Sequence, residues 1–202
     1  MCRSLQTEFP QIQVMPVAAD FTNGFVVPVP SSPAARNVIY FPGSTIGNFV
    51  RNDALSLLAG MADKAGVDGG VLIGVDLDKD RDILHEAYND SQGVTADFNL
   101  NVLRRINDEL GGGFDLDYFR YEAVFNEDLS CIEMNLISTC RQTVNVCKYS
   151  FSFEEGESVL TEYSHKYTVE SFGQMADEVG LAVKNVWTDV NDMFAVMYLE
   201  RV

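Results

Sequence analysis

The sequence predicts an α/β protein in which a doubly wound sheet is interrupted by an α+β insertion. Between residues 37 and 75 an apolar strand, a helix and a second apolar strand follow one another, which is the order of a βαβ unit with parallel strands. After Asp76 the pattern changes to a long helix and two long β-rich segments. Residues 181–201 then form a pair of strands, which we expect to return the chain to the first sheet.

The first part of the chain is expected to supply three strands and one helix. In chain order they are a strand over Val14–Ala19, a strand over Asn37–Phe41, a helix ending near Lys64 and a strand over Val71–Val75. Asn52 or Asp53 is placed to cap the helix, because both side chains accept hydrogen bonds from free backbone N–H groups. The apolar run after Gly69-Gly70 is typical of a strand buried on both faces.

The second part is expected to hold the insertion. The elements are a helix over Thr95–Leu110, β-rich segments over Phe119–Val146 and Tyr149–Thr168, a helix over Glu170–Val179, and strands over Leu181–Thr188 and Met193–Arg201. Three consecutive glycines from Gly111 are expected to end the long helix. We therefore place one domain over residues 1–78 and 167–202, and the insertion over residues 79–166.

Composition narrows the classes of function. The chain of 202 residues has 30 acidic and 14 basic residues, a net charge of −16 that repels phosphate backbones and argues against nucleic-acid binding. No apolar stretch is long enough to cross a bilayer. The four cysteines form no CxxC pair and only two histidines are present, so we expect reduced cysteines, no metal site and a cytoplasmic protein.

The loop after the second strand is the first candidate binding site. Gly43 and Gly47 allow a tight turn and a close approach to a ligand, and Asn48 offers an amide at the loop's rim. Ligands of open α/β sheets bind beyond the carboxyl ends of the strands, where this loop is expected to lie. The alternative is an ordinary strand-to-helix turn in which Asn48 caps the next helix.

Asp20 and Phe21 are a second candidate, at the end of the first predicted strand. The carboxylate is suited to accept from an adenine amino group while the ring packs on the base. The alternative is an aspartate that caps the following turn, beside a core phenylalanine.

A third candidate lies on the strand predicted from Leu160. Alternation places Glu162, Ser164 and Lys166 on one face and Tyr163 and His165 on the other. Glu162 and Ser164 would make a compact polar reader for an N–H-rich group such as imidazole. A solvated outer face of a sheet is the alternative meaning of this alternation.

Two further residues are weaker candidates, and several motifs are excluded. Tyr88 lies in a polar loop before a helix, where its hydroxyl is suited to bind a carboxylate, and Met134 is either core or a ligand contact. The acidic run from Asp76 lacks the glycine and glutamate of a calcium loop. There is no Walker lysine and no nucleophile elbow.

Taken in order, these segments resemble the histidine-specific, S-adenosylmethionine-dependent methyltransferases of ergothioneine biosynthesis (L-histidine Nα-methyltransferase). The matching stretches are Ala19–Thr22, Phe41–Asn48, Gly74–Leu77, Ala87–Asp90, Gly93–Asn99, Ile132–Met134 and Thr161–Tyr167. The final antiparallel strand pair is also the pattern of class I, Rossmann-like methyltransferase sheets, although other nucleotide-binding folds share these elements.

The resemblance implies methyl transfer from S-adenosylmethionine to the α-amino group of L-histidine, with no residue assigned as catalytic. The implied contacts are Asp20 and Phe21 for adenine, Asn48 and Tyr88 for the amino and carboxylate end of histidine, and Glu162, Ser164 and Met134 for the imidazole pocket.

The start of the chain departs from the family. The family's glycine-rich cofactor loop precedes Asp20 in chain order, and the nineteen residues before Asp20 contain no Gly. We therefore expect an N-terminally truncated form, which self-associates or pairs with a separate N-terminal segment. Two alternatives stay open: a methyltransferase of another small amine, and a non-catalytic remnant or partner subunit of this fold.

Overall fold

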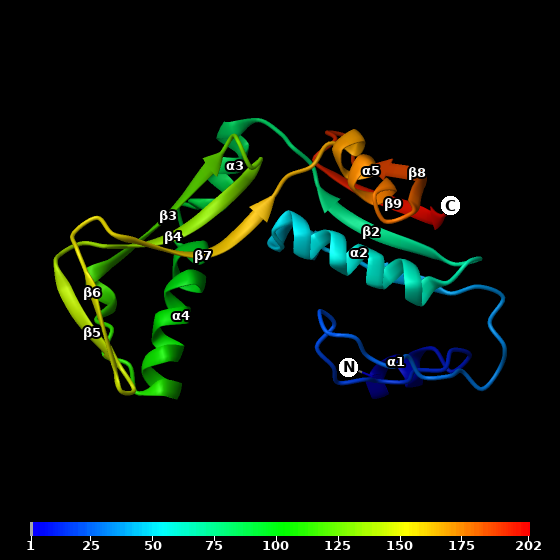
Figure 1. Ribbon diagram of the computed structural model, residues 1–202, viewed down its shortest axis with the longest axis horizontal. Helices are drawn as coiled ribbons and strands as arrows, with labels where there is room; N and C mark the ends of the chain where they lie inside the picture. Colours follow the sequence, from blue (N-terminus) through cyan, green and yellow to red (C-terminus); the bar gives the residue numbers. More distant parts are fainter. Residues whose placement is uncertain (1) are drawn as a thin grey trace.

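Two β-sheets and a β-hairpin contain the strands of the computed structural model, which describes residues 2–202 and their side chains from Ser4 onward (Figure 1). The helices are α1 (Cys2–Glu8), α2 (Arg51–Ala65), α3 (Arg81–Tyr88), α4 (Val94–Leu110) and α5 (Val169–Asp177), with short 3-10 helices η1 (Thr45–Asn48) and η2 (Leu116–Tyr118). The strands are β1 (Val38–Phe41), β2 (Gly70–Asp76), β3 (Phe119–Asn126), β4 (Cys131–Ser138), β5 (Gln142–Val146), β6 (Tyr149–Phe153), β7 (Ser158–His165), β8 (Leu181–Thr188) and β9 (Phe194–Arg201).

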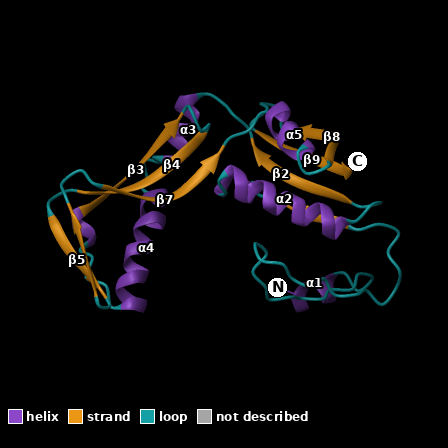
Figure 2. Ribbon diagram, viewed as in Figure 1, coloured by secondary structure: helices purple, strands orange, loops and turns teal. Residues whose placement is uncertain are grey.

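The first sheet has the strand order β1-β2-β9-β8. β1 and β2 are parallel and are connected through α2, whereas β9 is antiparallel to both of its neighbours. Leu58 of α2 and Phe172 of α5 are fully buried in one core with apolar side chains of β2 and β9. Figure 2 shows both helices beside this sheet. The predicted α/β class, with a Rossmann-like sheet that ends in an antiparallel strand pair, is confirmed.

The second sheet, with the order β3-β4-β7, is antiparallel throughout. Leu103 of α4 and Leu84 of α3 are buried in two smaller cores formed with its strands. The hairpin of β5 and β6 continues beyond it. As predicted, the long helix stops before Gly111, which adopts a left-handed conformation with φ 63°. The chain passes between the two sheets after β2 and again after β7 (Figure 1).

The predicted strand over Val14–Ala19 is wrong. Residues 9–37 contain neither helix nor strand, and most of them lie below α2 in the view of Figure 1. A strand requires a neighbouring strand to satisfy its backbone groups. β1 pairs only with β2, so it is an edge of the sheet, and backbone groups of the segment bind nearby side chains instead of a strand. For example, Gln6 accepts from Val14 N, and Gln13 accepts from Ser31 N.

Two smaller expectations also differ. The helix predicted to be capped by Asn52 or Asp53 begins earlier, with Val50 as its N-cap, so both side chains lie inside its first turn. Tyr88, expected in a loop, is the last residue of α3. The sequence does contain signals for this short helix: Ile83, Leu84 and Ala87 stand at helical spacing, and Asp80 caps the helix by accepting from Asp82 N and Ile83 N.

The buried ring of Phe172 gives a test of the first core. We expect Phe172→Ala to lower the free energy of unfolding by ~3–5 kcal/mol, because the cavity left in a core shared by α2, α5 and the sheet cannot fully collapse. Phe98→Ala, at a ring that is 65% exposed on α4, is the matched control and is expected to change it by less than ~0.5 kcal/mol. Urea unfolding followed by circular dichroism measures both, and equal losses would contradict this packing.

Candidate active site

Asn48 and Glu162 meet where the two sheets join. Asn48 is the last residue of η1, which follows β1, and Glu162 lies on β7. Asn48 Nδ2 donates to Glu162 Oε1 at 2.6 Å although the residues are 114 positions apart. The alternative in which Asn48 caps the next helix is wrong, because Val50 occupies that position. The amide and carboxylate predicted to share a site are therefore in direct contact.

The loop before Asn48 owes its course to two left-handed residues and one close approach. Gly43 and Ser44 have φ values of 75° and 53°, and Ser44 Oγ accepts from Asp76 N at 2.8 Å, which ties the loop to the end of β2. A Cβ on Gly47 would lie 2.9 Å from the carbonyl oxygen of His165. Because glycine has no Cβ, η1 can lie against β7 and bring Asn48 to Glu162.

Tyr88 and Ser164 form a second polar pair at the same junction. Their hydroxyl oxygens are 2.7 Å apart, and Lys166 Nζ donates to each of them at 2.7 Å. Lys166 is only 3% exposed, and its charge is balanced by Asp76 Oδ2 at 2.8 Å. Lys79 also binds Asp76, through the other carboxylate oxygen. The ammonium thus joins the end of β2 to the ends of α3 and β7.

The position of Tyr88 is fixed by the residue that follows it. Asn89 Nδ2 donates to Ala123 O, and Asn89 Oδ1 accepts from Ala123 N, both at 3.0 Å. These two bonds reproduce the pairing that a neighbouring strand would make with β3. The end of α3 is therefore held against the second sheet, and Tyr88 is aimed at Ser164.

Met134 lies beside Glu162. The two residues face each other in the register of β4 and β7, so their side chains share one face of the sheet. Met134 is buried, and its sulfur accepts from Asn99 Nδ2 at 3.7 Å. Thr161 Oγ1 lies 2.5 Å from Asn99 Oδ1, which fixes the amide. Met134 also packs with Leu84, Ala123 and Ile132, so an apolar core supports this part of the site.

Burial shapes the electrostatics of the junction. It raises the pKa of Glu162 above the ordinary carboxyl value. Burial also raises the pKa of Tyr121 to about 12, with smaller contributions from the nearby charges of Asp90 and Glu162. The Tyr121 hydroxyl is buried and has no hydrogen-bond partner within the described residues. Such a group is rare in a folded protein, and here it lies among the candidate residues.

Asp20 and Phe21 stand apart from the other five predicted residues. The Phe21 ring is 46% exposed and packs edge-on against Phe41 and Phe49, with centroids 5.7 and 6.3 Å away, so it lies at the carboxyl end of β1. The Asp20 carboxylate instead closes its own turn, accepting from Thr22 N, Thr22 Oγ1 and Asn23 Nδ2. The hydrogen bonds from Thr22 hold the pKa of Asp20 below its ordinary value.

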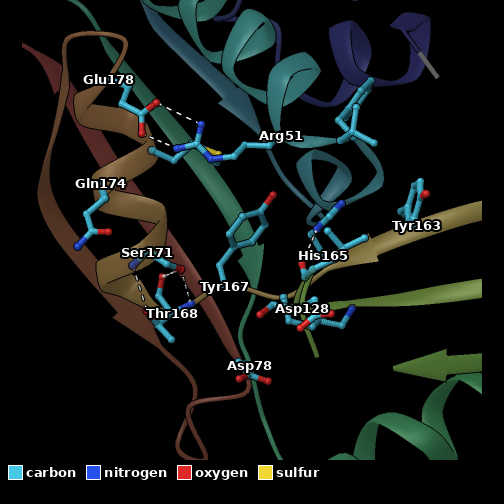
Figure 3. Close-up of a pocket in the computed structure, with 16 residues that line it drawn as sticks. Arg51, Asp78, Asp128, Tyr163, His165, Tyr167, Thr168, Ser171, Gln174 and Glu178 are labelled. Atoms are coloured by element: carbon cyan, nitrogen blue, oxygen red, sulfur yellow. Dashed lines mark hydrogen bonds and ion pairs between the residues drawn. The ribbon is translucent and has the colours of Figure 1, made fainter. Parts of the chain in front are cut away.

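A cavity of about 500 Å³ opens on the other side of β7 (Figure 3). Its walls include Tyr163 and His165 from the end of β7, and Tyr167 just after that strand. Arg51 of α2 also lines it and forms an ion pair with Glu178, the C-cap of α5. None of the seven residues predicted from the sequence lines this cavity. Tyr163 and His165 line it from the face to which alternation assigned them, and Lys166 lines it as well, so the cavity adjoins the cluster of Lys166, Tyr88 and Ser164.

Neither a metal-binding cluster nor a membrane-spanning helix occurs in the described residues. Among residues 2–202 no three His, Cys, Asp or Glu side chains are grouped so that they could hold a metal ion. Over the same range no helix has both the length and the apolar character needed to cross a bilayer.

The family of this chain follows from its similarity to known sequences. The family model described as "Histidine-specific methyltransferase, SAM-dependent" matches residues 1–201. The chain belongs to this family. Among its relatives, the Histidine N-alpha-methyltransferases of Mycolicibacterium smegmatis and Mycobacterium tuberculosis are 37% and 36% identical over 188 residues, 92% of this chain and 58% of each relative. Ergothioneine biosynthesis protein 1 of Schizosaccharomyces pombe is 28% identical over 149 residues, 73% of this chain and 19% of that protein.

The sequence motifs of this family member resemble those of histidine-specific methyltransferases, and the match to the family model confirms that resemblance. The chain spans a little over half the length of its mycobacterial relatives.

Sequence reasoning missed three residues of the junction. Alternation places Lys166 on the same face as Glu162 and Ser164, but nothing in the sequence indicates that this lysine is buried. Asp76 belongs to the stretch Gly74–Leu77 that carries the family resemblance, but no role for its side chain follows from the sequence. Tyr121 gave no signal, because its role depends on a strand that packs beside α3 only in the folded chain.

The ion pair of Asp76 and Lys166 predicts a stability effect. We expect Asp76→Asn to lower the free energy of unfolding by ~3 kcal/mol, because it leaves the buried ammonium without a counter-charge. Asp108→Asn, at an exposed position of α4, is the control and is expected to change it by less than ~0.5 kcal/mol. Chemical denaturation of both variants measures the free energy of unfolding. An unchanged value in Asp76→Asn would show that the ion pair contributes little to stability.

Proposed function

We propose that the chain carries the substrate-reading part of a histidine Nα-methyltransferase. The contact between Asn48 and Glu162 supports this most directly, because it joins two distant motifs of a family member at one place. In this proposal Asn48 and Tyr88 hold the amino and carboxylate end of L-histidine. Glu162 and Ser164 read the imidazole, and Met134 lines the same pocket.

The hydrogen-bond donors and acceptors of the proposed residues suit L-histidine. The bond from Asn48 uses one oxygen of Glu162, and the second oxygen remains to accept an imidazole N–H. A site built to pair an N–H rejects ligands that lack it, by ~10⁴-fold or more. Holding the amine in line with a reactive methyl group contributes up to ~7–11 kcal/mol in favourable cases. The proposed residues therefore act by position, and none transfers a proton.

S-adenosylmethionine, on which the family depends, supplies the methyl group as a sulfonium when it is bound. The adenine contacts that this chain offers fit that role. Asp20 uses three of the roughly four acceptor positions of its carboxylate, so one remains for an amino group. The half-exposed ring of Phe21 offers an edge of apolar surface at the end of β1. These residues would hold only the adenine end.

The proposal also includes the division of the chain into domains, its location and its self-association. The two sheets support a division into a domain of residues 1–78 and 167–202 and a substrate-binding insertion of residues 79–166. A cytoplasmic location and self-association of the chain remain predictions, the latter because β1 is an unpaired sheet edge.

Glu162→Ala tests the imidazole reader. We expect the chain to bind L-histidine more tightly than L-phenylalanine, which lacks ring N–H groups, and the substitution to remove most of this preference. Calorimetric titration of both amino acids measures it, with Glu122→Ala on β3, the far strand of the same sheet, as a control that keeps the preference. Preserved selectivity in Glu162→Ala would favour a methyltransferase of another amine. No heat from either ligand in the unsubstituted chain would favour the non-catalytic alternative.

The raised pKa of Glu162 predicts a pH effect on stability without any ligand. Burial disfavours the carboxylate, so the folded chain binds the carboxyl proton of Glu162 more tightly than the unfolded chain does. The stability that this proton contributes is fully present below the unfolded carboxyl pKa of ~4.3, and it is lost as the pH rises through the higher pKa of the folded chain. Between about pH 4 and pH 7 the unsubstituted chain should therefore lose Tm relative to Glu162→Gln. Thermal unfolding at several pH values measures the difference, with Glu122→Gln as control. A difference that does not vary with pH would argue against a buried carboxyl.

A further inference from the structure

Lys166 is the only charged residue that is buried in the part of the chain that the structure describes. Its ammonium has three N–H donors, and each has an acceptor: Asp76 Oδ2 at 2.8 Å, Tyr88 Oη at 2.7 Å and Ser164 Oγ at 2.7 Å. No donor remains for a ligand. Any effect of Lys166 on a substrate must therefore pass through the two hydroxyl groups.

The two hydroxyls hold two protons between them. Their oxygens are 2.7 Å apart, so one proton is used in the bond that joins them. Neither proton can be donated to Lys166, because an ammonium has no acceptor. The second proton therefore points away from the cluster. We propose that Lys166 is a positioning residue that makes the Tyr88–Ser164 pair offer a single proton to the substrate carboxylate, a role that rests on the proposed function.

A carboxylate is the acceptor that this arrangement favours. A hydroxyl whose oxygen accepts from an ammonium is polarised, and it becomes a stronger donor in a partly buried site. Such a donor gains most from an anionic acceptor.

A ligand-free experiment tests the network itself. In the ¹⁵N-lysine-labelled 202-residue chain, the ammonium of Lys166 should be shielded from exchange and visible in a proton–nitrogen correlation spectrum. Tyr88→Phe and Ser164→Ala should each shift this signal or abolish it by faster exchange. Neither of these variants changes Lys166, so the test can be carried out even if a Lys166 variant is unstable. A signal indifferent to both variants would overturn the proposal.

Titration with L-histidine and with histamine, which lacks the carboxylate, tests the acceptor. We expect Lys166→Met to weaken L-histidine binding about tenfold, the effect of one charge-assisted hydrogen bond, and to change histamine binding by less than twofold. The double variant with Tyr88→Phe should bind no more weakly than Tyr88→Phe alone. Lys79→Met is the matched control, because Lys79 binds the same Asp76 but neither hydroxyl. Since Asp76 keeps Lys79, Lys166→Met leaves no unpaired carboxylate.

The outcomes separate the two proposals. Equal losses for both ligands, or losses that multiply in the double variant, would show that Lys166 is merely structural and would overturn the inference. If the unsubstituted chain takes up neither ligand while the ammonium signal responds to Tyr88→Phe, the proposed function fails and the hydroxyl network stands.

Discussion

The ion pair between Lys166 and Asp76 is the contact on which the rest of the junction depends. A buried ammonium is tolerated only where a carboxylate balances it, and here the carboxylate comes from the end of β2 in the other sheet. The same residue's backbone donates to Ser44 and so fixes the loop that carries Asn48. Asp76 thus supports both polar pairs of the site, one through its side chain and one through its N–H group.

The candidate site exists only because segments far apart in the sequence meet. Asn48 comes from the loop after the first strand, Tyr88 from a short helix, and Glu162 and Ser164 from the last strand of the second sheet. Neither sheet contains a complete set of these groups. Because the second sheet brings the carboxylate and the first brings the amide, the chemistry of the site requires both sheets in place.

Much of this arrangement could be predicted from local patterns. The apolar run that became β2, the long helix stopped by Gly111 and the alternation that placed Glu162 with Ser164 are all set by neighbouring residues. What failed depended on partners elsewhere. Val14–Ala19 has the composition of a strand but no strand lies beside it, and Asp20 therefore closes a turn instead of ending a strand. The burial of Lys166 likewise follows from three acceptors on three different elements.

The two chain crossings between the sheets are themselves paired. Leu77 and Tyr167 form a parallel bridge, in which Asp78 N donates to Tyr167 O at 2.8 Å and Tyr167 N donates to Asp76 O at 3.1 Å. The connection between the sheets is therefore two-stranded rather than a pair of independent linkers. Asp76 directly precedes Leu77 and Lys166 directly precedes Tyr167, so the buried ion pair joins the same two crossings a second time, through side chains.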